Sequence, residues 1–452
     1  MRLAILALVA ATAFGIASGA AVHATLVSSE PAANSRLTTS PTRIRLVYSE
    51  PVEGKLAKVS IQPAVGAPIV LRAGADPRDV RAVIAPVDAL GPGSYRVEWR
   101  VVSADGHPVD GAFAFSIGDS AVTVPSSDTT LGVPAPPPPS DVEDDMEPLA
   151  WGPTAFGAPV VPAMLRGTGL GALMALAGML LMLVGSTRDA AQRTDPRVRR
   201  SITIFAVGAP LLLGAHLVTW LINTSPDLRF DPTWAASALG TTVGRVELWR
   251  VGLTILALWA WWLARRPTLA LLFATGALIV SGAVGHSAAI HPEWVIPAKA
   301  IHLLASAAWV GGLAWLAIRP AADDVELFAL DAARVSSRAL LAVIAVAFTG
   351  VVQTRLFLPA WGDLTTSAYG ALALVKTLGL LILIAFGAYN RQRIVPRLAA
   401  AARSATDVVV LRRSVNRELI VIGIVILIGG LLAYVPPPGE ADAGMSSASS
   451  TL

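Results

Sequence analysis

The stretch YRVEWRVVSADGHPVDGAFAFSIG, residues 95–118, decides the fold of the N-terminal part of this 452-residue chain. On either side of SADGHP, apolar and polar residues alternate with the period of two that is typical of a half-buried β-strand. The Ser, Asp, Gly and Pro between them are turn residues. The stretch therefore predicts two strands joined by a corner, and this corner carries Asp105 and His107.

The same alternation continues upstream of this stretch, in TRIRLVYSEPV (42–52) and AKVSIQPA (57–64). Several short strands separated by Pro, Gly, Asn and Asp turns are typical of a small all-β antiparallel sandwich or barrel, which we place at residues 23–118. The segment before it, residues 1–22, has one arginine, a long apolar run and small residues near its end. This pattern predicts a secretory signal peptide, with a retained membrane helix as the alternative.

Residues 119–158 differ from both of their neighbours. The sequence PSSDTTLGVPAPPPPSDVEDDMEP is rich in Pro, Ser and acidic residues. Such a segment cannot bury enough apolar area to fold, so we expect an extended linker.

The rest of the chain is strongly apolar. The whole protein is 54% hydrophobic and 15% charged, which is typical of a multi-span membrane protein. Residues 159–436 predict an all-α membrane domain of about eight transmembrane helices, and residues 437–452 a disordered tail. The expected helices are 163–186, 201–223, 247–264, 268–286, 297–318, 338–357, 369–389 and 418–436.

Arginine indicates how this domain is oriented. If eight spans alternate, the loops near residues 187–200, 265–266, 319–338 and 391–417 lie on one side, and they hold most of the arginines. The positive-inside rule makes that side cytoplasmic and places the N-terminal domain and the C-terminus outside the cytoplasmic membrane. Because the arginines account for topology, we expect the lipid bilayer and no nucleic acid as a partner.

The chain has no cysteine and six histidines. Disulfides and thiolate metal sites are therefore excluded, and imidazole becomes the main candidate metal ligand. With the predicted topology, every histidine lies outside the membrane or in its outer leaflet. The six are His23, His107, His216, His286, His291 and His302.

The corner pair Asp105 and His107 is two residues apart, so the side chains share a face in a strand or converge in a turn around Gly106. Such a pair alone is more typical of a solvated turn than of a site. His23 changes this, because it begins the mature chain if the signal peptide is cut directly before it. A terminal histidine can chelate a metal through its α-amine and Nδ1, and the resulting N and O donors suit Cu(II).

In the membrane domain a buried imidazole is costly unless it has a partner, which favours a functional role for His216, His286 and His302. We consider a shared ion or haem site, with proton handling or interhelical hydrogen bonding as the competing interpretation. Met174, Met179 and Met182 are expected to pack rather than to bind metal.

Three stretches of the N-terminal domain resemble the periplasmic copper-binding CopC family: HATLVSSEPAANSRL (23–37), IRLVYSEPVE (44–53) and residues 95–118. The membrane part resembles its usual partner, the CopD family, in TTVGRVELWR (241–250), TSAYGALALVKTLGLLILIAFGAYNR (366–391) and LRRSVNREL (411–419). The chain thus resembles a fusion of the two.

This resemblance implies a small antiparallel β domain whose Cu(II) ligands are His23, with its α-amine, Asp105 and His107. Residues 24–145 contain no methionine, so the Met-rich Cu(I) site of some CopC proteins is absent. The amine ligand exists only if the signal peptide is cleaved between Val22 and His23. This cut places Val22 at the position before the cleavage site, where small residues are preferred.

For CopD, the resemblance implies copper passage across the inner membrane in copper homeostasis or resistance. We therefore expect a non-enzymatic protein that captures Cu(II) outside and delivers it for transport, with uptake as the expected direction. A membrane path through His286, His291, His216 and His302 follows from their positions. The alternatives are a membrane-anchored copper buffer or sensor and a copper-dependent oxidase. The oligomeric state is left open.

Overall fold

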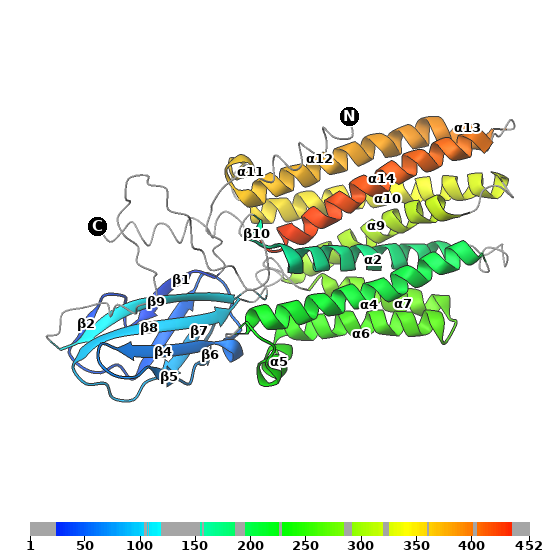
Figure 1. Ribbon diagram of the computed structural model, residues 1–452. Coiled ribbons are helices and arrows are strands. Elements are labelled where there is room, and N and C mark those ends of the chain that lie inside the picture. The colour runs from blue at the N-terminus through cyan, green and yellow to red at the C-terminus, as the bar shows by residue number, and fades with distance from the viewer. Residues whose placement is uncertain are drawn as a thin grey trace, which may run out of the picture. The chain divides into compact units, whose positions relative to one another are not determined.

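The computed structural model describes residues 24–103, 106, 108–118, 154–155, 158–185, 195–225, 228–283, 292–319, 325–358, 361–400 and 405–435. They fall into two compact units, a β domain and a helical bundle (Figure 1).

The β domain is a sandwich of two sheets. The four-stranded sheet has the order β1-β3-β7-β6, and the five-stranded sheet has the order β2-β9-β8-β4-β5. The strands are β1 (Leu26–Glu30), β2 (Arg36–Leu37), β3 (Arg43–Tyr48), β4 (Lys58–Pro63), β5 (Ile69–Leu71), β6 (Gly74–Asp76), β7 (Asp79–Pro86), β8 (Gly93–Val102) and β9 (Pro108–Ile117), with a 3-10 turn at Gly54–Leu56. All pairs within these two sheets are antiparallel except the two-residue pair of β2 with β9, which is parallel.

The alternation of apolar and polar residues along the strands explains how the two sheets pack. Ile44 and Leu46 on β3 are fully buried, as are Ile61 on β4 and Val97 on β8, and all four belong to one apolar cluster. Intervening residues such as Arg43 are exposed. The predicted strand pair is confirmed, because β8 and β9 pair along their whole length, from Gly93–Ile117 to Val102–Pro108.

The second unit is a helical bundle. Its helices are α2 (Val160–Gly185), α4 (Pro196–Thr224), α5 (Pro232–Leu239), α6 (Thr242–Trp262), α7 (Pro267–Ser281), α9 (Pro292–Ile318), α10 (Val325–Phe357), α11 (Asp363–Thr366), α12 (Ala368–Tyr389), α13 (Val395–Ala399) and α14 (Ala405–Leu432). A π-helical turn at Asn390–Ile394 links α12 to α13. A two-stranded ribbon of β10 (Thr154–Ala155) and β11 (Ala158–Pro159) precedes α2.

Each of the eight expected membrane segments corresponds to a helix, but only six of the described helices are long and apolar enough to cross a membrane. These six are α2, α4, α9, α10, the helical stretch that begins with α12, and α14. The exceptions are α6, which carries Arg245, Glu247 and Arg250, and α7, which has 15 residues. A multi-pass membrane domain is therefore evident, and the number of eight spans stays a prediction.

Helix α2 lies at the centre of the bundle, in contact with α4, α7, α9 and α14 (Figure 1). Small residues permit these close crossings. A Cβ atom built on Gly178 would lie 2.0 Å from the Ala307 carbonyl oxygen and 2.6 Å from Cα of Gly311, so only glycine fits where α2 meets α9.

Candidate functional site

The corner between β8 and β9 is a tight turn. Val102 and Pro108 form the last strand pair, which leaves residues 103–107 for the connection. The Gly106 N–H donates to the Ser103 carbonyl at 2.9 Å, and Gly106 has a φ of +96°, a conformation that favours glycine. The described part of the corner thus supports a turn rather than a continuous strand. Asp105 and His107 themselves lie outside the described residues, as does His23.

The chain directly after His23 is held by a carboxylate. Ala24 is fully buried, and its N–H donates to Oε1 of Glu50 at 3.1 Å. Glu50 is itself 2% exposed. Since the amide nitrogen of Ala24 belongs to the peptide bond that it shares with His23, Glu50 fixes the backbone beside this candidate ligand. Our sequence reasoning missed Glu50, although an acidic residue at the end of the apolar strand IRLVY is a signal that could have found it.

The segment that follows Glu50 contacts the corner. Val52 forms an isolated antiparallel bridge with Ser103, and the Glu53 N–H donates to the Val102 carbonyl at 2.7 Å. Residues 50–53 therefore touch both the backbone next to His23 and the beginning of the Asp105–His107 corner. The fold brings the neighbours of all three predicted ligands to one end of the sandwich.

An aromatic pair occupies the core near this end. Tyr48, two residues before Glu50, packs edge to face against Trp99 with ring centroids 5.3 Å apart. Both rings are buried. Burial raises the pKa of the Tyr48 phenol, so the free side chain stays protonated at neutral pH.

In the bundle, His216 is part of a buried polar cluster formed by three elements. It projects from α4 and is 1% exposed. Its Nε2 lies 3.8 Å from Oε1 of Glu247 on α6, and its Nδ1 lies 3.4 Å from the hydroxyl of Tyr434, which follows α14. Glu247 is 1% exposed and Tyr434 is buried. The expected partner of the membrane histidine therefore exists.

Glu247 also accepts a hydrogen bond from Arg250, which is fully buried one turn further along α6. Thr241 begins this helix by accepting the N–H of Gly244 at 3.1 Å. Residues three apart lie on one helical face, so the helix presents the carboxylate and the guanidinium together toward α4. Sequence analysis missed Glu247, Arg250 and Tyr434, although two charges on one face of an otherwise apolar helix are a signal.

His302 on α9 has a different partner. Its Nδ1 lies 2.9 Å from Oγ1 of Thr349 on α10, and the threonine hydroxyl lies 2.6 Å from the Ala345 carbonyl. Because this hydroxyl donates its proton to the carbonyl, it accepts from Nδ1–H of His302. The lone pair of the imidazole is then on Nε2, the nitrogen available to a ligand.

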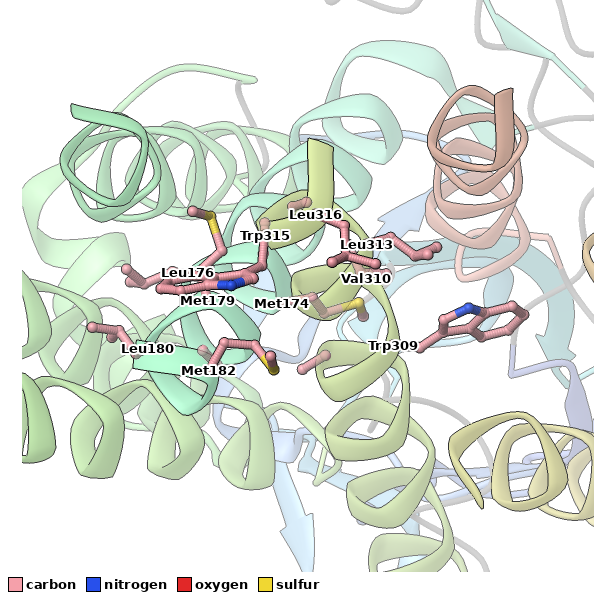
Figure 2. Packing of buried hydrophobic residues seen from close by; sticks show 14 of the residues in the cluster. Met174, Leu176, Met179, Leu180, Met182, Trp309, Val310, Leu313, Trp315 and Leu316 are labelled. Carbon is pink, nitrogen blue, oxygen red and sulfur yellow. The ribbon is translucent and has the colours of Figure 1, made fainter. Parts of the chain in front are cut away.

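The expected methionines pack in the core of the bundle. Met174, Met179 and Met182 on α2 are buried in a cluster that includes Trp309 and Trp315 of α9, and the sulfur of Met182 also accepts a hydrogen bond from Arg338 at 3.2 Å (Figure 2). The burial of all three side chains is consistent with a role in packing. Among the described residues no three His, Asp or Glu side chains gather as a metal site. His286 and His291 lie outside the described part of the chain.

Three family models match the chain. The CopC domain matches residues 26–118, the copper resistance protein D-like N-terminal domain matches 158–294, and copper resistance protein D matches 329–432. The chain joins a CopC domain to a CopD-family membrane domain.

Relatives agree with this division. The chain is 25% identical over 398 residues to the copper transport protein CutJ of Bacillus subtilis, covering 81% of this chain and 67% of that protein. Its CopC domain is 37% identical over 113 residues to copper resistance protein C of Escherichia coli, which it covers to 87%. Against the crystal structure of CopC from Methylosinus trichosporium OB3b, the identity is 29%, with a TM-score of 0.20, covering 23% of this chain and 99% of that one.

Proposed function

We propose that the protein binds Cu(II) in its CopC domain, outside the cytoplasmic membrane, and delivers the ion to its CopD-family domain for uptake. The observation that carries this proposal is the segment 50–53. It contacts the backbone beside His23 through Ala24 and the corner of Asp105 and His107 through Ser103. Two distant parts of the sequence, each next to a proposed ligand, thus contact the same segment, and this supports the proposal.

In the CopC domain the ligands are His23, Asp105 and His107, with the α-amine of His23 as a further donor when the signal peptide is cut directly before it. Imidazole, amine and carboxylate together form a tetragonal N,O set, which suits Cu(II). The buried carboxylate of Glu50 accepts the N–H of Ala24 and so fixes the backbone next to the ligand His23.

In the membrane domain, His286 and His291 accept the ion near the entrance, and His216 and His302 pass it inward. Each of the last two offers its Nε2 side while its Nδ1 contacts a hydroxyl, from Tyr434 or Thr349. A second contact of this kind orients a metal-binding imidazole.

The domain site is tested by Cu(II) titration of the full chain, followed by EPR. We expect Asp105→Ala and His107→Ala each to lower the affinity for the first Cu(II) at least tenfold and to change its EPR spectrum. Asp110→Ala, which removes an exposed carboxylate on β9, is the matched control and should titrate like wild type. Unchanged spectra in both site variants would contradict the assignment of these ligands.

Transport is tested by copper accumulation in cells that lack other uptake routes. His216→Ala and His302→Ala should each reduce accumulation, whereas Thr219→Ala, one turn along α4 from His216, should not. Accumulation equal to wild type would remove the two histidines from the path. Liposomes that show tight Cu(II) binding without any copper flux would instead favour the buffer or sensor alternative.

A further inference from the structure

The buried polar cluster formed by α4, α6 and the chain after α14 contains the charged residues Glu247 and Arg250 in addition to His216. A histidine with only a structural role needs a hydrogen-bond partner, not a buried ion pair. Arg250 is 0% exposed, and its one hydrogen bond to a described residue runs from Nη2 to Oε2 of Glu247. Its Nε and Nη1 are buried and have no hydrogen-bond partner among the described residues. A fully buried guanidinium held by a single partner is costly, so the cluster calls for a functional explanation.

Glu247 divides its two oxygens between different neighbours. Oε2 accepts from Arg250, and Oε1 lies 3.8 Å from Nε2 of His216. Nitrogen and oxygen ligands bind first-row metals at about 2 Å, so both atoms can reach one ion placed between them. Tyr434 contacts Nδ1 on the opposite side of the ring, which directs Nε2 toward the carboxylate.

We infer that Glu247 and His216 together form a copper-binding station, and that Arg250 takes the place of the metal when the station is empty. The inference rests on the proposed function for its cargo, but it adds a ligand and a positioning residue to it. The ligand class is a Cu(II) ion held by one imidazole and one carboxylate, with water completing the coordination.

Arg250 also sets how tightly the station holds copper. A carboxylate buried in the bundle needs a cation beside it, and the guanidinium supplies one when no ion is present. When copper arrives, the same guanidinium repels it at close range in a medium of low dielectric. The ion is bound weakly enough to leave again, as passage through a membrane requires.

The test is Cu(II) titration of the full chain in detergent, followed by EPR, in a background with Asp105→Ala and His107→Ala. We expect Arg250→Gln to tighten Cu(II) binding to the membrane domain at least tenfold. Arg250→Lys, which keeps the charge, should bind like the background. Arg245→Gln removes an exposed arginine from the same helix and is the matched control, with no expected change. General damage to the fold does not produce a gain in affinity.

Two further variants identify the ligands. Adding His216→Ala to Arg250→Gln should abolish the gain. The neutral pair Glu247→Gln with Arg250→Gln leaves no buried charge unpaired, so it remains informative if Arg250→Gln alone fails to fold. This pair should bind Cu(II) at least tenfold more weakly than the background. Equal binding by the neutral pair, or no gain in a folded Arg250→Gln protein, would overturn the inference.

Uptake measured in parallel separates this inference from the proposed function. If Arg250→Gln binds more tightly but the wild-type protein moves no copper, the station exists and the transport proposal fails. If wild-type cells accumulate copper and Arg250→Gln changes neither affinity nor accumulation, the transport proposal stands and the station is wrong.

Discussion

The two units of the protein differ in where most of their ion pairs lie. In the β domain, alternation places most charged side chains of the strands outward, and pairs such as Arg43 with Glu30 are more than half exposed, whereas Glu50 and Asp76 are buried. In the bundle, Arg250 with Glu247 and Arg319 with Asp331 are almost completely buried. Exposed pairs stabilise a fold by about 0–1 kcal/mol, whereas breaking a buried pair costs several times more.

This difference shows where each unit can build a site. The strands of the β domain form its core, and the proposed ligands His23, Asp105 and His107 belong to segments outside these strands. The bundle has its polar groups on the helices themselves, where packing fixes them, as in the contact of His216 with Glu247. A loop site suits capture of an ion from solution, and a helix site suits a path through a membrane.

The largest predicted effect lies in a buried pair of the bundle. Asp331 on α10 accepts from the Trp315 indole at 3.0 Å and from Arg319, and it is 3% exposed. Asp331→Ala leaves Arg319 buried without its carboxylate, so we expect a loss of about 3–5 kcal/mol in the free energy of unfolding. The measurement is reversible unfolding in mixed micelles.

Glu326→Ala provides the control for this experiment, because Glu326 is exposed and lies in the first turn of the same helix. We expect a change within about 0.5 kcal/mol for it. Equal losses in the free energy of unfolding for the two variants would show that a buried ion pair of the bundle contributes no more to stability than an exposed charge.

The sequence was sufficient for features that repeat locally. Alternation predicted β3, β4, β8 and β9, and long apolar runs predicted the major helices of the bundle. It could not reveal the parallel pairing of β2 with β9, because a two-residue strand has no measurable period. It also missed the link of Glu50 to Ala24, since residues 26 apart meet only after the sheets have packed.

The membrane cluster shows the same limit more clearly. His216 could be named because a histidine in an apolar helix is unusual. Its neighbours Glu247 and Tyr434 could not be assigned to it, because they come from α6 and from the chain after α14. Only the packing of three helices, which hydropathy does not encode, brings these groups together.

The second prediction compares how the two units tolerate added volume, starting with the bundle. At Gly178 a Cβ meets the backbone of α9, which cannot rotate away. Gly178→Val should therefore force α2 and α9 apart and cost about 3 kcal/mol or more. Gly208→Ala on α4 is the control, because its Cβ has nothing within 4 Å and it should stabilise the helix slightly. Thermal unfolding in detergent measures both, and a Gly178→Val protein as stable as wild type would contradict the close crossing.

The third prediction adds a side chain at a crowded glycine of the β domain, as the second does in the bundle. A Cβ on Gly111 of β9 would lie 2.5 Å from Cζ2 of Trp99, which is a side-chain atom rather than backbone. The indole is buried against Tyr48 and can make room only by disturbing that contact, so Gly111→Ala should cost about 1–3 kcal/mol, less than the change at Gly178. Gly74→Ala, with nothing within 4 Å of its Cβ, is the control. Hydrogen exchange of β8 and β9 amides reports the loss, and a larger loss here than at Gly178 would reverse the comparison.

The smallest effect is expected for the ion pair of Arg45 with Asp76 in the β domain, in which the aspartate is buried and the arginine is partly exposed. The Arg78 N–H, at 2.9 Å, and the Arg45 guanidinium hold the pKa of Asp76 below its usual value. Because this pKa is lower in the folded state, the contribution to stability is present above the unfolded pKa of about 3.9 and is lost as pH falls through the folded value. Asp76→Asn should therefore weaken protection of β3 and β7 amides at pH 7 and match wild type near pH 2. The comparison is made at each pH, with Asp88→Asn as the exposed control, and a difference from wild type that persists at the lowest pH would assign the effect to packing instead of charge.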